Sequence, residues 1–155
     1  MNDKPRKFKI ATKDIAMLRL LRENSRLTLT QISRKTKIPI STLYDRLKLL
    51  EKDSIVRHTT LIDFAKFGLS TKVHFLLKSP PGVRKPLQSF LQAHPDINSV
   101  YEMADDFQLF AEGIFENMTA AQKFKNNLEN TFDQIESKTR FIVRNLKQEA
   151  FCISS

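Results

Sequence analysis

TLTQISRKTKIPISTLYDRLKLLEK, residues 28–52, is the stretch that decides the fold of the first part of this chain. Thr28 and Gln31 have the spacing of a capping box, in which each side chain satisfies a backbone N–H that the start of a helix leaves unpaired. A short helix is therefore expected here, and it ends before Pro39, because proline disfavours a helical residue before it. The positions of this helix predicted to face a core are Leu29, Ile32 and Ser33.

A second helix is predicted directly after this first one. Leu43, Leu47 and Leu50 recur at helical spacing and form one apolar face. The opposite face carries Ser41, Tyr44, Asp45 and Lys48. Two short helices joined by a tight turn make a helix-turn-helix, whose second helix can enter the major groove of DNA.

The distribution of charge supports a nucleic-acid partner. The 155 residues include 26 Lys and Arg against 17 Asp and Glu, a net charge of +9. Residues 1–60 hold 15 of the basic and 6 of the acidic side chains, whereas residues 61–155 hold 11 of each. Because the whole excess lies with the helix-turn-helix, we predict a basic domain that binds double-stranded DNA, followed by a neutral domain with another role.

Composition excludes several other classes of protein. No apolar run approaches the roughly 20 residues needed to cross a bilayer, and residues 1–10 lack the apolar centre of a secretory signal. The single cysteine, Cys152, cannot form an internal disulfide, which fits a reducing compartment. We therefore expect a soluble, cytoplasmic protein without a membrane partner.

The segments around residues 28–52 complete the predicted domain. A helix from Lys13 to Asn24, capped by Thr12, supplies a supporting apolar face. Residues 55–62 are rich in β-branched side chains and predict an extended strand leading into a linker that ends around Gly68. The basic N-terminal arm is interpreted either as a solvated terminus or as a DNA contact; it contains Lys4, Arg6, Lys7 and Lys9.

The second half alternates strand and helix patterns. A capping-box spacing of Thr119 and Gln122 precedes its second helix. The order strand, helix, strand, strand, helix, strand is the ferredoxin-like βαββαβ pattern of an α+β protein. The expected ranges are strands 71–78, 97–103, 107–115 and 139–146, and helices 84–93 and 120–132. The predicted domains are residues 1–54, a linker strand 55–68, and residues 69–155.

The order of residues between Ile10 and Gly68 resembles a known family. The matching positions are Ile10-Ala11, Asp14, Met17-Leu18, Leu21, Asn24-Ser25-Arg26, Gln31-Ile32-Ser33, Ser41-Thr42-Leu43, Arg46-Leu47, Leu50-Glu51 and Gly68. They are similar to the N-terminal winged-type helix-turn-helix domain of the Lrp/AsnC (feast/famine) transcription regulators. Pro39 stands where that family usually has a capping serine, and Ser54 where it usually has glycine. We predict Pro39 as a first-turn residue of the second helix.

The second half resembles the family's RAM (regulation of amino-acid metabolism) domain. In relatives that domain forms dimers, often assembled into octamers, and binds small effectors, so the resemblance implies a homodimer, tetramer or octamer and an amino-acid-like effector. Relatives that sense amino acids carry a threonine-glycine-x-tyrosine-aspartate loop, which here reads Ala104, Asp105, Asp106, Phe107 and Gln108. The last four are the candidate effector residues. Alternatively, the two aspartates form an ordinary hairpin turn and regulation needs no effector.

The predicted function is sequence-specific DNA binding as a dimer at pseudo-palindromic promoter sites, with half-sites roughly 34 Å apart. The groove-facing candidates are Ser41, Thr42, Tyr44, Asp45 and Lys48, and the phosphate-contacting candidates are Thr28, Arg34, Lys35 and Arg46. Asp45 has an equal alternative as a surface ion pair with Lys48.

Catalytic and metal chemistry receive no support from the sequence. The three histidines have no carboxylate or cysteine at metal-ligand spacing, and the phenylalanines fit core packing or a dimer interface better than base stacking. We therefore expect no catalytic residues, metal or cofactor. Two alternatives remain: an architectural protein that coats DNA with little sequence preference, and, less favoured, an enzyme similar to sirohaem decarboxylases. The latter share the two-domain layout, but this neutral second half lacks clustered His and Arg.

Overall fold

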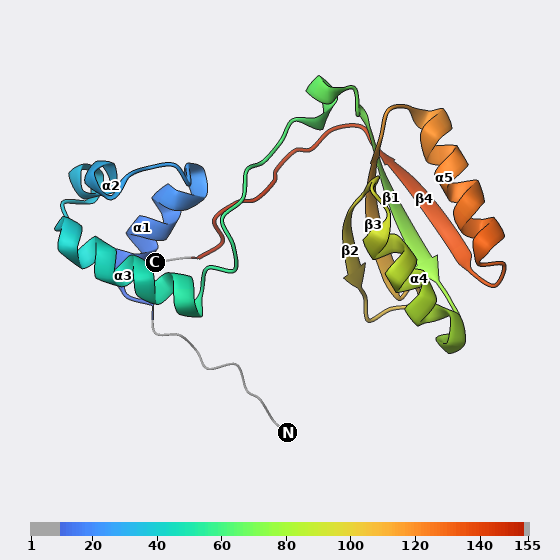
Figure 1. Cartoon of the computed structure of the whole chain (residues 1–155), viewed down its shortest axis with the longest axis horizontal. Coiled ribbons are helices and arrows are strands. Elements are labelled where there is room, and N and C mark those ends of the chain that lie inside the picture. Colours follow the sequence, from blue (N-terminus) through green and yellow to red (C-terminus); the bar gives the residue numbers. More distant parts are fainter. Residues whose placement is uncertain (1–9, 154–155) are drawn as a thin grey trace. The chain divides into compact units, whose positions relative to one another are not determined.

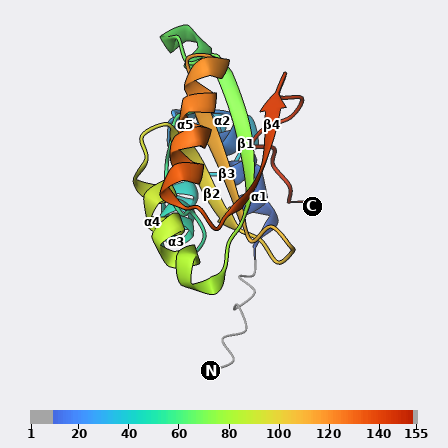
Figure 2. The same cartoon turned by 90° about the vertical axis from the view of Figure 1, so that its right-hand side faces the viewer.

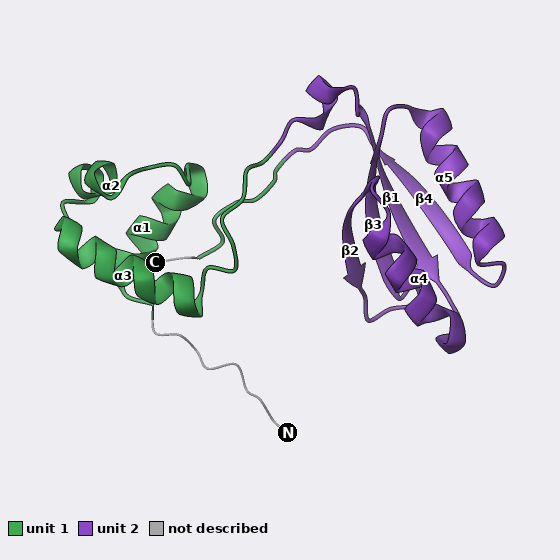
Figure 3. Cartoon of the chain, viewed as in Figure 1, with its two compact units in different colours: residues 1–61, 147–155 green, residues 62–146 purple. Residues whose placement is uncertain are grey.

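The computed structural model describes residues 10–153, which divide into two compact units (Figures 1 and 3). Unit 1 comprises Met1–Leu61 together with Lys147–Ser155, and unit 2 comprises Ile62–Leu146. The expected DNA-binding domain falls in unit 1. The division differs from the predicted domains at the C-terminus, because the last residues join unit 1 although they follow the final strand of unit 2.

Unit 1 is built from three helices: α1 (Thr12–Glu23), α2 (Leu29–Thr36) and α3 (Ile40–Asp53). They enclose a small apolar core of Met17, Ile32, Ile38, Leu43 and Leu50, all buried. Each helix therefore contributes at least one side chain to the core. The predicted helix-turn-helix is confirmed as α2 and α3.

The start and end of α2 follow local backbone chemistry. The Gln31 N–H donates to Thr28 Oγ1 at 3.2 Å, and the Thr28 N–H donates to Gln31 Oε1 at 2.8 Å. This confirms the predicted capping box. The helix ends at Thr36, and Lys37, directly after it, has a left-handed φ of 60° and donates its N–H to the Ser33 carbonyl at 2.8 Å. The left-handed residue reverses the chain within the tight turn.

Two predicted helix starts are corrected by the structure. Thr12 is the first residue of α1, which follows Ala11, and the carboxylate of Asp14 accepts the Ala11 N–H at 2.9 Å. Pro39 is the residue before α3 and not part of its first turn. Its carbonyl accepts the Leu43 N–H at 3.0 Å, so the backbone alone begins the helix.

The strand predicted over residues 55–62 is wrong. These residues adopt no regular structure, and Val56 is 96% exposed. A strand needs a partner to satisfy its backbone, and the strands within residues 10–153 pair among themselves. A short 3₁₀ helix, η1 (Phe64–Phe67), follows, and Gly68 ends it with a left-handed φ of 83°.

Unit 2 is a four-stranded antiparallel sheet with two helices. Its elements are β1 (Thr71–Lys78), α4 (Pro81–Ala93), β2 (Ile97–Glu102), β3 (Leu109–Phe115), α5 (Met118–Thr131) and β4 (Glu136–Ile142). The strand order is β2-β3-β1-β4, and β2 and β3 form the predicted hairpin. This confirms the ferredoxin-like α+β fold.

Both helices of unit 2 cover one face of the sheet (Figure 2). Val73, Phe75 and Leu77 alternate along β1 and point into the core between sheet and helices. The Phe75 ring lies 5.1 Å from that of Phe124 on α5 and 6.1 Å from that of Phe115, between ring centres. Core packing by these phenylalanines is confirmed.

Most boundaries in unit 2 differ from the prediction by a few residues; β3, for example, begins at Leu109 rather than at residue 107. The helix α4 begins at Pro81 rather than at residue 84, because proline needs no N–H partner in the first turn. Asn117, not Thr119, caps α5: its side-chain oxygen accepts the Ala120 N–H at 2.9 Å. The strand β4 begins at Glu136 and ends at Ile142, where its pairing with β1 stops at Lys72.

Candidate DNA-binding surface

The exposed face of α3 carries most of the predicted groove-facing residues. Ser41, Asp45 and Lys48 are exposed, Tyr44 is 51% exposed, and Thr42 is half-buried. The opposite face buries Leu43 and Leu50 completely in the core of unit 1. The helix therefore turns a polar surface outward while its apolar residues anchor it.

Tyr44 and Lys48 lie together on this surface. The Lys48 Nζ lies 5.1 Å from the centre of the Tyr44 ring, a distance typical of a cation–π contact. Among the ion pairs of residues 10–153, none joins Asp45 to Lys48. The structure therefore gives no support to the surface-pair alternative for Asp45 and leaves its carboxylate on the outward face of α3.

Arg46 has a partner inside unit 1. Its Nε donates to Asp14 Oδ1 at 2.7 Å, and a second guanidinium nitrogen pairs with the other carboxylate oxygen of Asp14 on α1. Asp14 is fully buried, whereas the Arg46 side chain is about one-third exposed. This bidentate contact joins α1 to α3, so Arg46 holds α3 in position on α1. The predicted contact of Arg46 with a phosphate stays a prediction.

The pKa of the Asp14 carboxyl group is lowered from its ordinary value. The hydrogen bond from Arg46 is the largest cause, and the N–H of Ala11 and the positive charge of Arg46 add to it. Burial of the carboxyl group opposes this shift in pKa without reversing it. Asp14 therefore remains ionised, as the pairing with Arg46 requires. Sequence reasoning did not find this pair because its members are 32 positions apart.

The remaining phosphate candidates belong to α2. Arg34 and Lys35 are exposed in its last turn, where their charges also interact favourably with the helix dipole. Thr28 is exposed, but its hydroxyl already serves the capping box. The basic N-terminal arm with Lys4, Arg6, Lys7 and Lys9 lies outside the described residues.

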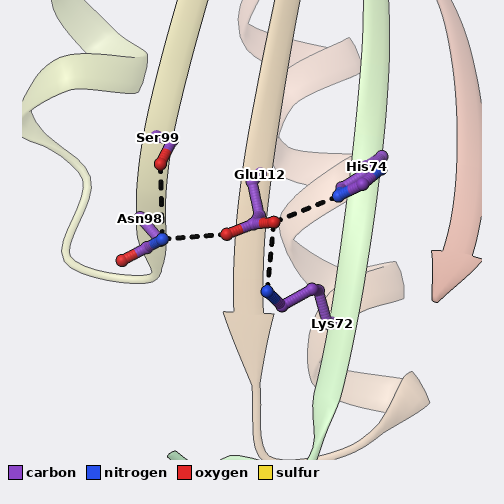
Figure 4. A network of polar contacts seen from close by, with 5 residues as sticks. All are labelled: Lys72, His74, Asn98, Ser99 and Glu112. Atoms are coloured by element: carbon purple, nitrogen blue, oxygen red, sulfur yellow. Dashed lines mark hydrogen bonds and ion pairs between the residues drawn. The ribbon is translucent and has the colours of Figure 1, made fainter. Parts of the chain in front are cut away.

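Unit 2 holds a polar network on the sheet face opposite its helices (Figure 4). Glu112 on β3 accepts from Asn98 at 2.8 Å, lies 3.1 Å from His74 Nε2 and pairs with Lys72 Nζ at 3.2 Å. Burial alone would raise the pKa of Glu112, but the contacts from Asn98, His74 and Lys72 together lower it below its usual value. The sequence analysis missed this cluster, although His74 and Glu112 stand directly opposite in register.

The candidate effector residues lie in the loop between β2 and β3. Asp105 accepts the Phe107 N–H at 2.8 Å, which is the hydrogen bond of an aspartate turn. The Gln108 side chain donates to the Asp106 carbonyl at 2.8 Å and accepts the Ser79 N–H at 3.2 Å. The Lys138 Nζ lies 4.3 Å from the centre of the Phe107 ring. Three of the four candidates therefore use side-chain atoms to hold the loop together.

Two further findings on the described residues concern membrane-spanning helices and metal sites. None of the helices within residues 10–153 is long and apolar enough to cross a membrane. Across the same residues, no group of three or more His, Cys, Asp or Glu side chains is placed to hold a metal ion.

Comparisons with known proteins agree on the class. Residues 10–57 match the winged helix-turn-helix DNA-binding family. An uncharacterised HTH-type transcriptional regulator of Pyrococcus abyssi is 30% identical over 124 residues, covering 77% of this chain and 79% of the relative. A glutamate uptake regulatory protein of Zymomonas mobilis is 30% identical over 97 residues, which cover 60% of this chain and 59% of that protein.

Solved structures share the whole fold. A transcriptional regulator of Neisseria meningitidis, solved as a complex with L-Met, superimposes with a TM-score of 0.83 at 19% identity, covering 90% of this chain and 93% of its own. Bacillus subtilis LrpC superimposes with a TM-score of 0.81 at 22% identity, and the match covers 90% of this chain and 99% of the LrpC chain.

The helix-turn-helix, its exposed α3 surface and the ferredoxin-like unit define a DNA-binding regulator with a separate second domain. The fold and the P. abyssi relative identify it more closely. The chain belongs to the Lrp/AsnC family of HTH-type transcriptional regulators, and its function is DNA-binding transcription regulation.

Proposed function

We propose that this regulator binds a two-fold symmetric DNA site as a dimer, with α3 of each protomer in a major groove. The observation that carries the proposal is the outward face of α3, where Ser41, Tyr44, Asp45 and Lys48 are exposed while Leu43 is buried beneath them. A helix of 14 residues is long enough to reach several base pairs.

Different residues of unit 1 would carry affinity and specificity. The carboxylate of Asp45 can accept from a cytosine amino group, and Lys48 can donate to guanine. Ser41, Thr42 and Tyr44 would reach base edges or the adjoining backbone. Arg34 and Lys35, which are exposed on α2, would contact phosphates and add affinity to every sequence alike.

The sheet of unit 2 supports the dimer. Both helices cover one face, and the other face exposes Tyr101 to 58%, beside Phe110 at 5.7 Å between ring centres. We propose that this open face packs against the same face of a second copy, because a two-fold interface uses the same surface on both protomers. The Glu112 network would lie within or beside that interface. Tetramers or octamers would then form from such dimers.

Selection from a library of random duplexes at about 150 mM salt tests the DNA proposal, since weak phosphate binding is suppressed there. We expect a two-fold symmetric motif with half-sites about one helical turn apart. Lys48→Ala and Tyr44→Ala should change the selected sequence, and Arg34→Ala should weaken all sequences equally. Absence of any motif, with affinity that falls steeply as salt rises, would instead indicate an architectural DNA-coating protein.

We propose that the loop of Asp105, Asp106, Phe107 and Gln108 is mainly structural and that regulation does not require a conventional amino acid. The turn and bridging hydrogen bonds of Asp105 and Gln108 support this. The N. meningitidis regulator was solved with L-Met, so L-methionine is the first effector to try. Calorimetric titration with L-methionine and the other common amino acids should give no heat of binding. Saturable heat that Gln108→Ala abolishes would overturn this proposal.

We also propose that the protein has no catalytic activity or cofactor and acts in the cytoplasm, where its DNA partner would be met. Its membership of a regulator family supports this. A coloured, tetrapyrrole-like ligand in the purified protein would instead favour the sirohaem-decarboxylase alternative.

A further inference from the structure

The C-terminal segment, residues 147–153, packs on α1 of unit 1. Arg22 on α1 pairs its guanidinium with the carboxylate of Glu149, and its Nε donates to the Glu149 carbonyl at 3.0 Å. One helical turn earlier, the Arg19 guanidinium lies 5.7 Å from the centre of the Phe151 ring. Three contacts of different kinds therefore join the end of the chain to one helix.

The backbone of this segment is shaped for the contact. Glu149 has a left-handed φ of 53°, a backbone conformation that residues other than glycine rarely adopt. A residue held in such a conformation depends on its surroundings, and here both its side chain and its carbonyl are engaged by Arg22. The segment is therefore fitted to α1 rather than simply lying near it.

The residues between β4 and the docked segment differ from the docked residues in their exposure to solvent. Val143 is fully exposed and Leu146 is 84% exposed, while Ala150 and Phe151 are partly buried. The apolar side chains of Val143 and Leu146 thus stay exposed after β4, whereas Ala150 and Phe151 are partly covered where the chain meets α1. Because the chain passes from unit 1 to unit 2 after Leu61 and returns at Lys147, the two units are connected at two points (Figure 3).

We propose that the C-terminal segment is a clasp that docks on α1 through Arg19 and Arg22 and gives the DNA-binding unit a second attachment to unit 2. One flexible connection would let unit 1 turn freely, whereas two connections limit its range. α1 is in turn joined to α3 by the Asp14–Arg46 pair, so a restraint on α1 is passed to the outward helix. Resting on the dimeric function proposed above, the clasp narrows the range of half-site spacings that one dimer can bind.

Docking can be measured without DNA. Cys152 is the single cysteine of the chain and is exposed, so a nitroxide spin label can be attached within the segment. In the labelled wild-type chain, the electron paramagnetic resonance spectrum should show a slow component from the docked segment. Glu149→Lys should convert that component to fast motion, because the introduced ammonium group would repel Arg22.

Charge-matched variants distinguish the loss of docking from a mere change in net charge. Glu23→Lys changes the charge of the same unit by the same amount, next to Arg22, and should leave the slow component unchanged. Arg22→Glu should free the segment, and the double variant Arg22→Glu with Glu149→Lys should restore slow motion with the ion pair reversed. A label that is equally mobile in all of these proteins would overturn docking.

The range of half-site spacings that the protein binds tests the second part of the proposal, the restraint on unit 1. The wild-type protein and Glu23→Lys should prefer the selected site over one lengthened by about five base pairs, half a helical turn. Glu149→Lys should reduce that preference by roughly tenfold, since a freer second attachment changes the effective concentration at the second half-site. An unchanged preference despite a freed label would overturn the restraint on spacing. If no two-fold site were selected at all, the proposed function would fail while the spin-label result still decided docking.

Discussion

The two units of this regulator are stabilised in different ways. Unit 1 buries five apolar side chains in its core and relies on a buried carboxylate, Asp14, to join α1 to α3. Unit 2 buries eleven core residues, three of them phenylalanines in mutual contact. A small core leaves more of the stability to single polar contacts, so substitutions should affect the two units through different kinds of residue.

The largest effect is expected from Phe75→Ala in unit 2. Phe75 is fully buried and contacts Phe115 and Phe124, so truncation removes apolar burial and leaves a cavity. The loss in free energy of unfolding should be about 3–5 kcal/mol. Denaturant unfolding followed by circular dichroism measures it. Phe141→Ala, at a side chain that is 44% exposed on β4, is the control and should cost under about 1 kcal/mol.

Asp14→Ala should have the next largest effect, and on unit 1. It removes the two contacts to Arg46 and the acceptor for the Ala11 N–H. Loss of charge-assisted hydrogen bonds should cost about 2 kcal/mol. Hydrogen exchange should show faster opening of α1 and α3, with β1 and β3 unaffected. Asp45→Ala, an exposed carboxylate on α3, serves as the control, and an equal effect from both would contradict the distinction between the units.

Local patterns in the sequence predicted the helix-turn-helix and the order of unit 2 because both depend on short-range periodicity. β1 was expected over its observed range, and the capping box of Thr28 and Gln31 was confirmed. The Asp14–Arg46 pair and the Glu112 network could not be predicted in the same way. Their members come from distant positions that only the tertiary fold brings together.

The errors in the prediction also have physical causes. Residues 55–62 have β-branched side chains typical of strands, but side-chain preference does not supply a pairing partner. Thr119 and Asn117 are both good capping residues, and only the backbone geometry shows that Asn117 performs the role. Among the candidate DNA-binding residues, the outward positions on α3 followed from periodicity, whereas the partner of Arg46 did not.

Thr28→Ala should give a smaller change in unit 1. The substitution removes the side-chain acceptor for the Gln31 N–H at the start of α2. Loss of a helix cap typically costs about 1 kcal/mol, half the effect expected for Asp14→Ala. Hydrogen exchange of the first turn of α2 reports it directly. Thr30→Ala, on the exposed surface of the same helix, should leave exchange unchanged or slower.

The smallest effect concerns the acid sensitivity of unit 2. The folded-state pKa of Glu112 is lowered, because the contacts from Asn98, His74 and Lys72 outweigh the effect of burial. A group with a lowered pKa in the folded state contributes stability that is present above its unfolded pKa, here near 4.5, and lost as pH falls through the folded value. Glu112→Gln should therefore lower the free energy of unfolding of unit 2 at pH 7 by under about 1 kcal/mol, which lowers its melting temperature. The difference from wild type should shrink as the pH falls below 4.5 and through the folded pKa of Glu112.

Thermal melts of the wild-type protein, Glu112→Gln and the exposed control Glu102→Gln between pH 7 and pH 3 would measure this. Convergence of wild type and Glu112→Gln on acidification, with Glu102→Gln parallel to wild type throughout, is the expected result. If the difference between the two curves did not shrink as the pH fell below 4.5, the contribution of Glu112 would lie in packing rather than in its charge. The charge of Glu112 would then add nothing to the stability of unit 2, and the contrast with unit 1, where a buried charge joins two helices, would be stronger still.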